Sequence, residues 1–252
     1  MSTTDSHTVL AIGAHPGTLE LLCGGTLILL HQRGWRIVMA TMTPGNPALD
    51  ARPAKKFAQA QISAANQSAQ LVAGEYQCLE SVDFMIFFND APCRRVTGLV
   101  RATAPDIVLT HSAVDGVADN EETSRIVHQA CTHAPDADYE SEGWAPGLAP
   151  LPRVPALYYL DPADGRDFLG RPIRTALVVD VSGVVETKDK MLAKYGEAYH
   201  GTFRTRMREL GSQRGREAGC SFGEGLRRHT GEAFPRHDQF GDTLDSLLHA
   251  IS

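Results

Sequence analysis

The strongest constraint on the fold is a regular alternation of short apolar runs with segments of helical periodicity. The apolar runs have the length of buried strands and cover Val9 to Gly13, Arg36 to Thr41, Tyr76 to Leu79, Ile107 to Thr110, Ala156 to Leu160 and Ala176 to Val181. Helices are predicted over Leu19 to Gln32, Pro53 to Ala73, Cys93 to Thr103 and Glu121 to His133. Strands that alternate with helices predict an α/β fold, a Rossmann-like, mostly parallel sheet with helices on both faces.

The segments outside this alternation fit within the same unit, so a single domain over residues 1–252 is expected. Ala134 to Pro155 is rich in Pro, Gly and acidic residues and predicts a loop or lid inserted near 134–155. Phe84 to Phe88 is ambiguous between a short strand and a buried loop. Ser182 to Gly219 is expected to be helical and charged, and a final amphipathic helix is expected over about Thr243 to Ile251.

Composition limits the partners and the compartment. Lys and Arg total 24 and Asp and Glu total 30, so the formal net charge is -6 and argues against a nucleic-acid or anionic-membrane partner. The apolar runs are too short to span a bilayer, and the N-terminus lacks the basic and apolar segments of a signal peptide. Five dispersed cysteines favour free thiols in a reducing cytoplasm. Ten histidines make a metal enzyme worth testing.

His15 is the first candidate for a functional residue because of its place in the predicted sheet. In open α/β sheets, ligands bind beyond the carboxyl ends of the strands. His15 follows the first predicted strand and precedes the first predicted helix. Its imidazole can therefore bind a metal or transfer a proton there, unless it only satisfies the backbone at the entry to the helix.

Several motifs accompany His15 in a fixed order along nearly the whole chain. They are Ala14 to Glu20 with Cys23 to Leu27, Ala40 to Gly45, Arg101 to Ser112, Tyr158-Tyr159, Lys188 to Ala193, and Arg214 to Gly225. Together they resemble the PIG-L/LmbE-like zinc N-deacetylase superfamily, whose opening motif is Ala-His-Pro-Asp-Asp-x-Glu followed by Gly-Gly-Thr. The resemblance implies an α/β deacetylase fold, a zinc cofactor and a small sugar-like or acyl-amine ligand.

The residues at the metal positions depart from the pattern that this resemblance implies. In the family, zinc is held by the motif histidine, the second Asp of the pair and a distant histidine, and the first Asp is the general base. Carried over by position, His15 is retained, whereas the base corresponds to Gly17 and the carboxylate ligand to Thr18. The distant histidine corresponds to Asn120, and the preceding Asp119 is kept.

These departures predict that the usual zinc chemistry is lost. A threonine hydroxyl and an asparagine amide are weak ligands for zinc, which prefers thiolate, imidazole and carboxylate groups. With glycine at position 17, no carboxylate is left there to take a proton from water. We therefore expect no bound metal and no other cofactor. Positions that belong to the scaffold still match the family, namely Glu20, Gly24, Gly25, Asp106, Lys188 and Glu224.

One hypothesis is an enzyme of hydrolase lineage that acts in the old pocket without zinc. The expected catalytic residues are His15, His111, Asp115 and Asp119. The expected substrate-binding residues are Thr18, Asn120, Glu20 and Tyr195. In this hypothesis His111 forms an acid/base pair with Asp115 or Asp119. Each residue also has a structural interpretation: Glu20 braces the first helix, and Asp119 caps the helix that follows it.

Two other hypotheses stay open, so the sequence leaves the question of enzyme activity undecided. The second is a non-catalytic protein that binds a small ligand or an active relative, and here either a homo-oligomer or a pair with an active paralogue is expected. The third is a metal-dependent deacetylase with a rearranged zinc site, for example His15 with His111 and Asp115 or Asp119.

Overall fold

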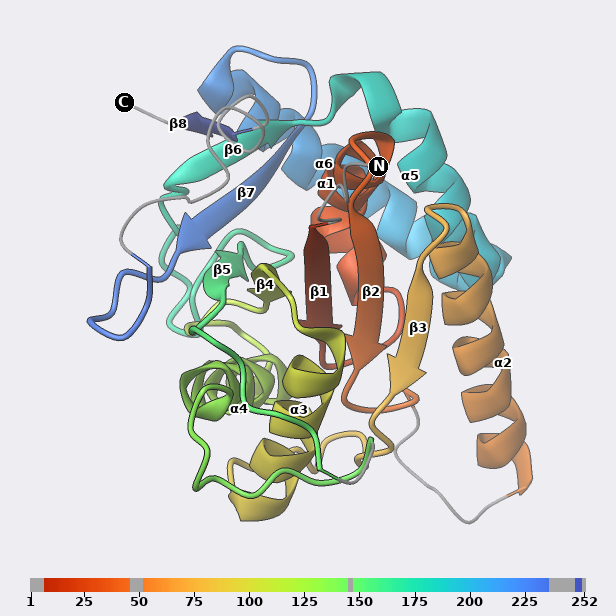
Figure 1. Ribbon diagram of the computed structural model, residues 1–252. Helices are drawn as coiled ribbons and strands as arrows, with labels where there is room; N and C mark the ends of the chain where they lie inside the picture. The colour runs from red at the N-terminus through yellow and green to blue at the C-terminus, as the bar shows by residue number, and fades with distance from the viewer. Residues whose placement is uncertain (1–6, 46–51, 145–146, 236–247, 251–252) are drawn as a thin grey trace, which may run out of the picture.

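The computed structural model describes residues 7–45, 52–144, 147–235 and 248–250 (Figure 1). In this part of the chain the strands form one mixed sheet in the order β3-β2-β1-β4-β5-β7-β6-β8. The strands are β1 (Thr8–Gly13), β2 (Arg36–Thr41), β3 (Glu75–Cys78), β4 (Ile107–Thr110), β5 (Ala156–Leu160), β6 (Leu177–Asp180), β7 (Gly223–Arg228) and β8 (Leu248–Ala250). The first five strands pair in parallel, and β7 begins an antiparallel extension.

Helices cover both faces of the sheet, as expected from the alternation (Figure 1). They are α1 (Thr18–Gln32), α2 (Arg52–Gln70), α3 (Asp90–Thr103), α4 (Ala118–His133), α5 (Val185–Leu192) and α6 (Glu197–Ala218), with two short 3-10 turns, η1 (Ser182–Val184) and η2 (Ala193–Tyr195). Within the described residues, none of the helices is both long and apolar enough to cross a membrane.

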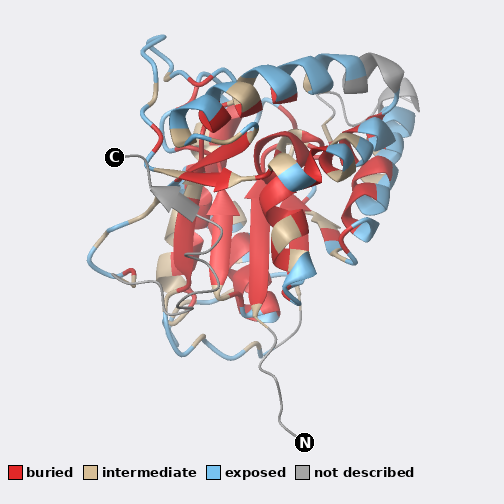
Figure 2. Ribbon diagram, turned by 90° about the horizontal axis from the view of Figure 1, so that it is seen from above, coloured by how far each residue is buried: buried red, intermediate tan, exposed pale blue. Residues whose placement is uncertain are grey.

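The period of two along each strand divides the core into two layers. In β1, Val9 and Ala11 pack into the cluster that contains α1 and α2 side chains, whereas Leu10 and Ile12 pack into the cluster that contains α3 and α4 side chains. Because helices cover both faces of the sheet, the parallel strands are continuous apolar runs in the sequence. Figure 2 shows the central strands buried between the helices.

A buried ion pair joins three of the expected scaffold residues, Gly25, Lys188 and Glu224. Lys188 Nζ lies 2.6 Å from Glu224 Oε1, and both side chains are almost fully buried. The same carboxylate accepts the backbone N–H of Gly25 at 2.7 Å and both the N–H and the hydroxyl of Thr26. Glu224 of β7 can approach α1 this closely because residue 25 has no side chain: a Cβ there would lie 2.9 Å from its Oε1.

The antiparallel side of the sheet corrects two expectations from the sequence. Strand β7 was not expected, because its sequence Gly-Glu-Gly-Leu-Arg-Arg has no apolar run or alternation, and it forms by pairing with β5 and β6. The expected final helix is wrong over Leu248–Ala250, which pair with β6 as β8. The rest of that helix prediction, residues 243–247 and 251, lies outside the described residues. Partners across the sheet override the local pattern here.

The segment near 134–155 has neither helix nor strand in its described residues. Phe84 to Phe88 is a loop and not a strand, and it is not the expected buried loop, because every residue in it except Ile86 is exposed. The order of the parallel strands reverses between β1 and β4, since β1 leads to β2 on one side while β4 lies on the other. This switch point is where an open α/β sheet leaves a crevice for ligands.

Candidate functional site

Three side chains from separate loops meet beside the switch point. His15 follows β1, Asp83 lies in the loop after β3, and Asp119 lies in the first turn of α4. His15 Nε2 is 2.7 Å from Asp83 Oδ1 and 2.9 Å from Asp119 Oδ2. Both carboxylates are buried and the imidazole is mostly so. Asp83 is the new member of this group, which we call the His15 cluster.

The hydrogen bonds of the His15 cluster leave one buried oxygen unsatisfied. A ring nitrogen carries at most one hydrogen. His15 Nε2 makes its hydrogen bond with Asp119 Oδ2. Asp83 Oδ1 is buried and has no hydrogen bond within the described structure, although it touches the same nitrogen. Nor does any Lys or Arg among the described residues pair with Asp83 or Asp119. The two negative charges thus face one imidazole.

The donor set of the His15 cluster fits a divalent cation. Its three ligand atoms, one imidazole nitrogen and two carboxylate oxygens, lie within 4.8 Å of one another. Zinc takes such ligands at about 2.0–2.2 Å in tetrahedral geometry, and its catalytic sites use three protein ligands and an open position. A dication would balance both carboxylates and satisfy Asp83 Oδ1. The sequence-based expectation that the ligand set is lost did not consider Asp83.

The backbone beside Asp83 is held in an unusual conformation that serves Asp119. Phe84 has φ 60, a value that bulky residues rarely adopt. In this conformation its N–H donates to Asp119 Oδ2 at 2.8 Å. Local strain of this kind is found where the surrounding structure demands it, and often at functional sites. The loop after β3 and the start of α4 are therefore joined at the cluster.

His111 supports the loop that carries His15. Its Nε2 accepts the backbone N–H of Ala14 at 2.9 Å, so the neutral ring carries its hydrogen on Nδ1. The ring is fully buried, and burial, with a smaller effect of His15, lowers the pKa of His111 to about 3. Its Nδ1 has no partner in the described structure. The expected acid/base pair of His111 with Asp115 or Asp119 does not form among these residues.

Asp115 and Asn120 organise the turn before α4. Asp115 Oδ1 accepts the N–H of Val117, and its own N–H donates to Glu121 Oε1. Burial raises the pKa of Asp115, and hydrogen bonds from Val117 and the Asn120 side chain oppose this shift. The cap of α4 is Val117 rather than Asp119, whose side chain points to His15 instead.

The other predicted substrate-binding residues make contacts within the scaffold. Thr18 Oγ1 donates to the carbonyl of His15 at 2.7 Å and closes the loop before α1. Tyr195 donates its hydroxyl hydrogen to Glu20 Oε1 at 2.8 Å, and both side chains are buried. Burial raises the pKa of both groups. This geometry agrees with the interpretation that Glu20 braces α1, and their role toward a substrate stays a prediction.

Exposed apolar residues lie next to Asp83 and Asp119 along the chain. Phe84 is 69% exposed, beside Asp83, and Met85 and Phe87 follow it in the same loop. Val117, two residues before Asp119, is also exposed. Large exposed apolar residues that lie together commonly mark a ligand or partner surface. The cluster therefore has an apolar rim.

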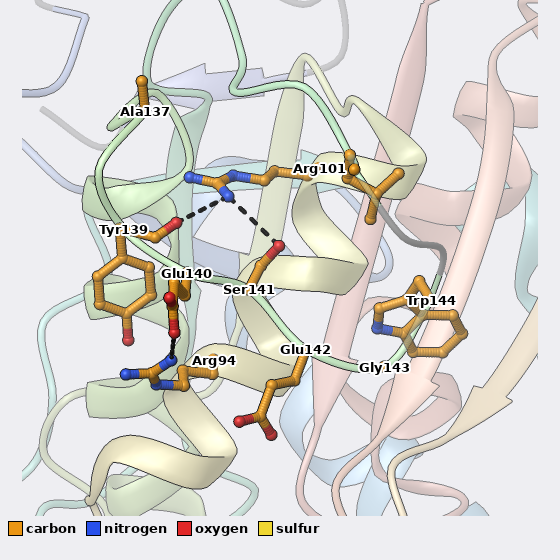
Figure 3. Close-up of a pocket in the computed structure, with 11 residues that line it drawn as sticks. Arg94, Arg101, Ala137, Tyr139, Glu140, Ser141, Glu142, Gly143 and Trp144 are labelled. Atoms are coloured by element: carbon orange, nitrogen blue, oxygen red, sulfur yellow. Dashed lines mark hydrogen bonds and ion pairs between the residues drawn. The ribbon is translucent and has the colours of Figure 1, made fainter.

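A large cavity lies elsewhere, between α3 and the inserted loop (Figure 3). It has a volume of about 660 Å³ and shares no residue with the His15 cluster. Arg101 points from α3 to the loop, where its guanidinium donates to the carbonyl of Tyr139, the hydroxyl of Ser141 and further loop carbonyls. Its donors are already used, so Arg101 anchors the loop to α3. A lid function for this segment stays a prediction.

Asp83 is the site residue that sequence reasoning missed. It matches no position of the family's ligand set, and it stands beside an aromatic run of uncertain structure. The available signal was its position: an acidic residue in the loop after a parallel strand belongs to the same edge of the sheet as His15.

Comparison with known proteins agrees with this fold. The PIG-L family, described as GlcNAc-PI de-N-acetylase, matches residues 10–131. An uncharacterized deacetylase from Escherichia coli is 50% identical over 42 residues, which span 17% of this chain and 23% of that protein. The structure of N,N'-diacetylchitobiose deacetylase from Pyrococcus horikoshii is similar with a TM-score of 0.75 and 18% identity, covering 89% of this chain and 84% of that one. The 4-carboxy-2-hydroxymuconate hydratase from Pseudomonas putida is similar with a TM-score of 0.72 and 19% identity, covering 92% and 98%.

Proposed function

We propose that the chain, whose residues 10–131 match the PIG-L family, is a metal-dependent hydrolase of a small N-acyl compound, with the metal held by His15, Asp83 and Asp119. The observation that carries the proposal is the convergence of these three ligand atoms, with the buried Asp83 Oδ1 lacking a hydrogen bond. Asp83 takes the place of the carboxylate that Thr18 no longer provides. This is the rearranged-site hypothesis, with a carboxylate from a different loop.

The residues of the chain supply the rest of the site. His15, Asp83 and Asp119 would hold a divalent metal, which would supply Lewis acidity toward water and a carbonyl group. Asp119 is oriented by the N–H of Phe84, and His15 is positioned by the loop that His111 and Thr18 hold in place. The exposed apolar rim offers contact to an acyl or other apolar part of the substrate.

Proton transfer distinguishes this site from the usual family pattern. Glycine at position 17 provides no carboxylate, so we assign the proton from water to a carboxylate oxygen of Asp83 or Asp119 that does not hold the metal. A positioned general base contributes about 10²–10⁴-fold to such reactions, so turnover is expected to be slow. The fold itself does not limit the reaction to deacetylation, because one similar structure is a hydratase.

Metal analysis tests the proposal directly. Protein supplied with zinc and then freed of unbound metal is expected to contain about one metal ion per chain, the number that one three-ligand site holds. Asp83→Asn and His15→Ala should lower the bound metal to near zero, because each removes one ligand. Asp138→Asn, an exposed aspartate outside the cluster, is the matched control and should retain it.

Activity provides the second measurement. Release of acetate from an N-acetylated amino sugar should depend on the metal and should be lost in Asp83→Asn. Wild-type protein that binds no zinc in excess zinc would overturn the proposal and favour a metal-free ligand-binding protein. Metal bound equally by wild type and Asp83→Asn would show that Asp83 is not a ligand.

A further inference from the structure

A second cavity opens at the carboxyl ends of β4 and β5. It has a volume of about 330 Å³ and is lined by residues 112–114, 159–161 and 173–174, together with Arg227. It adjoins the loop that supports the His15 cluster: Ser112 lines it, and the preceding His111 is bonded to Ala14, beside His15. The volume lies in the range of small-molecule sites.

Two arginines in the wall of this cavity are exposed and lack acidic partners. Arg174 has no ion pair or side-chain hydrogen bond within the described structure. Arg227 donates to the backbone carbonyl of Arg174 and has no ion pair among the described residues. This contact joins the side chain of Arg227 to the backbone of Arg174, and both residues line the cavity. Most of their donors remain available.

The carboxylate in the cavity wall does not neutralise these arginines. Asp161 is buried and lies 2.7 Å from the guanidinium of Arg214, an arginine of α6 that is itself buried. Asp161 also accepts a hydrogen bond from Thr175. Asp161 forms its ion pair with Arg214, and Arg227 attracts it only at longer range. The hydrogen-bond donors of Arg174 and Arg227 therefore stay available to another anion.

The rest of the cavity is suited to the carbon skeleton of a ligand. Val114, Leu160 and Ile173 line it with apolar side chains, and the hydroxyl of Tyr159 is bonded to His229 Nδ1 at 3.0 Å. An apolar wall with a few converging charged groups is the usual construction of a small-molecule site. Guanidinium groups bind carboxylates through two parallel hydrogen bonds.

We propose that this cavity is a binding site for the carboxylate group of a small organic acid, held by Arg174 and Arg227. The carboxylate would be the end of a ligand whose remainder reaches the His15 cluster along the loop that contains Ser112. That the ligand is the substrate rests on the proposed function, whereas the binding of the carboxylate does not.

Titration calorimetry with succinate tests this site, and inorganic phosphate serves as a second anion. Wild-type protein should bind succinate more tightly than phosphate, because the planar carboxylate matches the guanidinium fork. The Arg174→Gln/Arg227→Gln double variant should bind succinate at least 10-fold more weakly, since hydrogen bonds to charged groups are lost. Arg33→Gln is the matched control. This exposed arginine follows α1 and lies near the amino end of β2, whereas the cavity lies at the carboxyl ends of the strands.

The same titration in Asp83→Asn separates this proposal from the metal proposal. Succinate affinity should stay within about twofold of wild type there, because the two arginines are unchanged. Loss of succinate binding in Asp83→Asn but not in the arginine double variant would place the anion on the metal and overturn the site. Equal succinate binding by wild type and the double variant would also overturn the proposed site. Tighter binding of phosphate than succinate would overturn the carboxylate assignment.

Discussion

At the scale of the residue, the decisive quantity is how many hydrogens are available at His15. Two carboxylate oxygens lie within 2.9 Å of a ring nitrogen that can carry only one hydrogen. Two carboxylates that face one imidazole are costly to bury without a further cation. The same local argument assigns His111 a supporting role, because its Nε2 is occupied by Ala14 and its ring stays neutral.

His111 gives a prediction about acid stability. Its pKa in the folded protein is about 3, below the usual 6.5 that is expected after unfolding. Between these values the unfolded chain binds a proton that the folded chain does not, so stability is lost as the pH falls below about 6.5. His111→Gln, whose side-chain oxygen can still accept the Ala14 N–H, should reduce this loss by up to about 1.4 kcal/mol per pH unit.

Urea unfolding of wild type and His111→Gln at several pH values between 4 and 7 measures this difference. A parallel decline of both proteins with falling pH would show that His111 does not carry the acid sensitivity. The comparison is made between the two proteins because burial also lowers the pKa of His128 and His229, and both residues remain in the variant.

At the scale of the element, α1 shows how a motif that looks catalytic can be structural. The Gly-Gly-Thr segment lies within a helix that is buried over most of its length. The backbone N–H groups of Gly25 and Thr26 donate to the carboxylate of Glu224, which forms an ion pair with Lys188 of α5. Three elements are thus joined at one buried charge pair. Breaking such a pair from one side costs about 3–5 kcal/mol.

The two glycines of α1 should respond differently to substitution. A Cβ at Gly25 would lie 2.6 Å from Val181 Cγ1 and 2.9 Å from Glu224 Oε1, so Gly25→Ala should destabilise the protein by about 1–3 kcal/mol. A Cβ at Gly24 would meet the Lys188 side chain at 3.4 Å, an ordinary contact. Gly24→Ala should leave stability unchanged or raise it by up to about 1 kcal/mol, because alanine favours the helix.

Urea unfolding midpoints at a constant slope measure both changes. The Gly24→Ala variant is the matched control, since it makes the same substitution in the same helix. Similar midpoints for the two variants would contradict the close approach of Val181 and Glu224 to α1.

At the scale of the whole molecule, the proposed metal would connect segments that are distant in the sequence. The His15 cluster combines loops that follow β1 and β3 with the first turn of α4. A ligand that binds only the folded state stabilises the whole fold, by about 2.7 kcal/mol at 100 times its dissociation constant. For a chain of this size, 1 kcal/mol corresponds to about 2–4 °C in melting temperature.

Zinc should therefore raise the melting temperature of wild-type protein by about 5–10 °C under these conditions, and a chelator should reverse the rise. Asp83→Asn should show little shift, whereas Asp138→Asn should behave as wild type. An equal rise in wild type and Asp83→Asn would indicate that zinc binds outside the cluster.

The amino-acid sequence alone determined the parallel half of the molecule. Apolar runs at strand length, separated by segments with helical spacing, can bury their side chains only in a sheet covered on both faces, and β1 to β5 confirm this. The same pattern placed His15 at the carboxyl edge of the sheet. The hydrophobic pattern does not predict the antiparallel strands β7 and β8, because they form by pairing with neighbouring strands.

Only the tertiary structure decided which groups reach His15. The positions that match the family's metal ligands in the sequence include Thr18 and Asn120, which make contacts elsewhere. Asp83 reaches the imidazole because loops from separate strands converge at one edge of the sheet. Distance along the chain carries no information about this convergence. Strand order and loop conformation, including that of Phe84, set it.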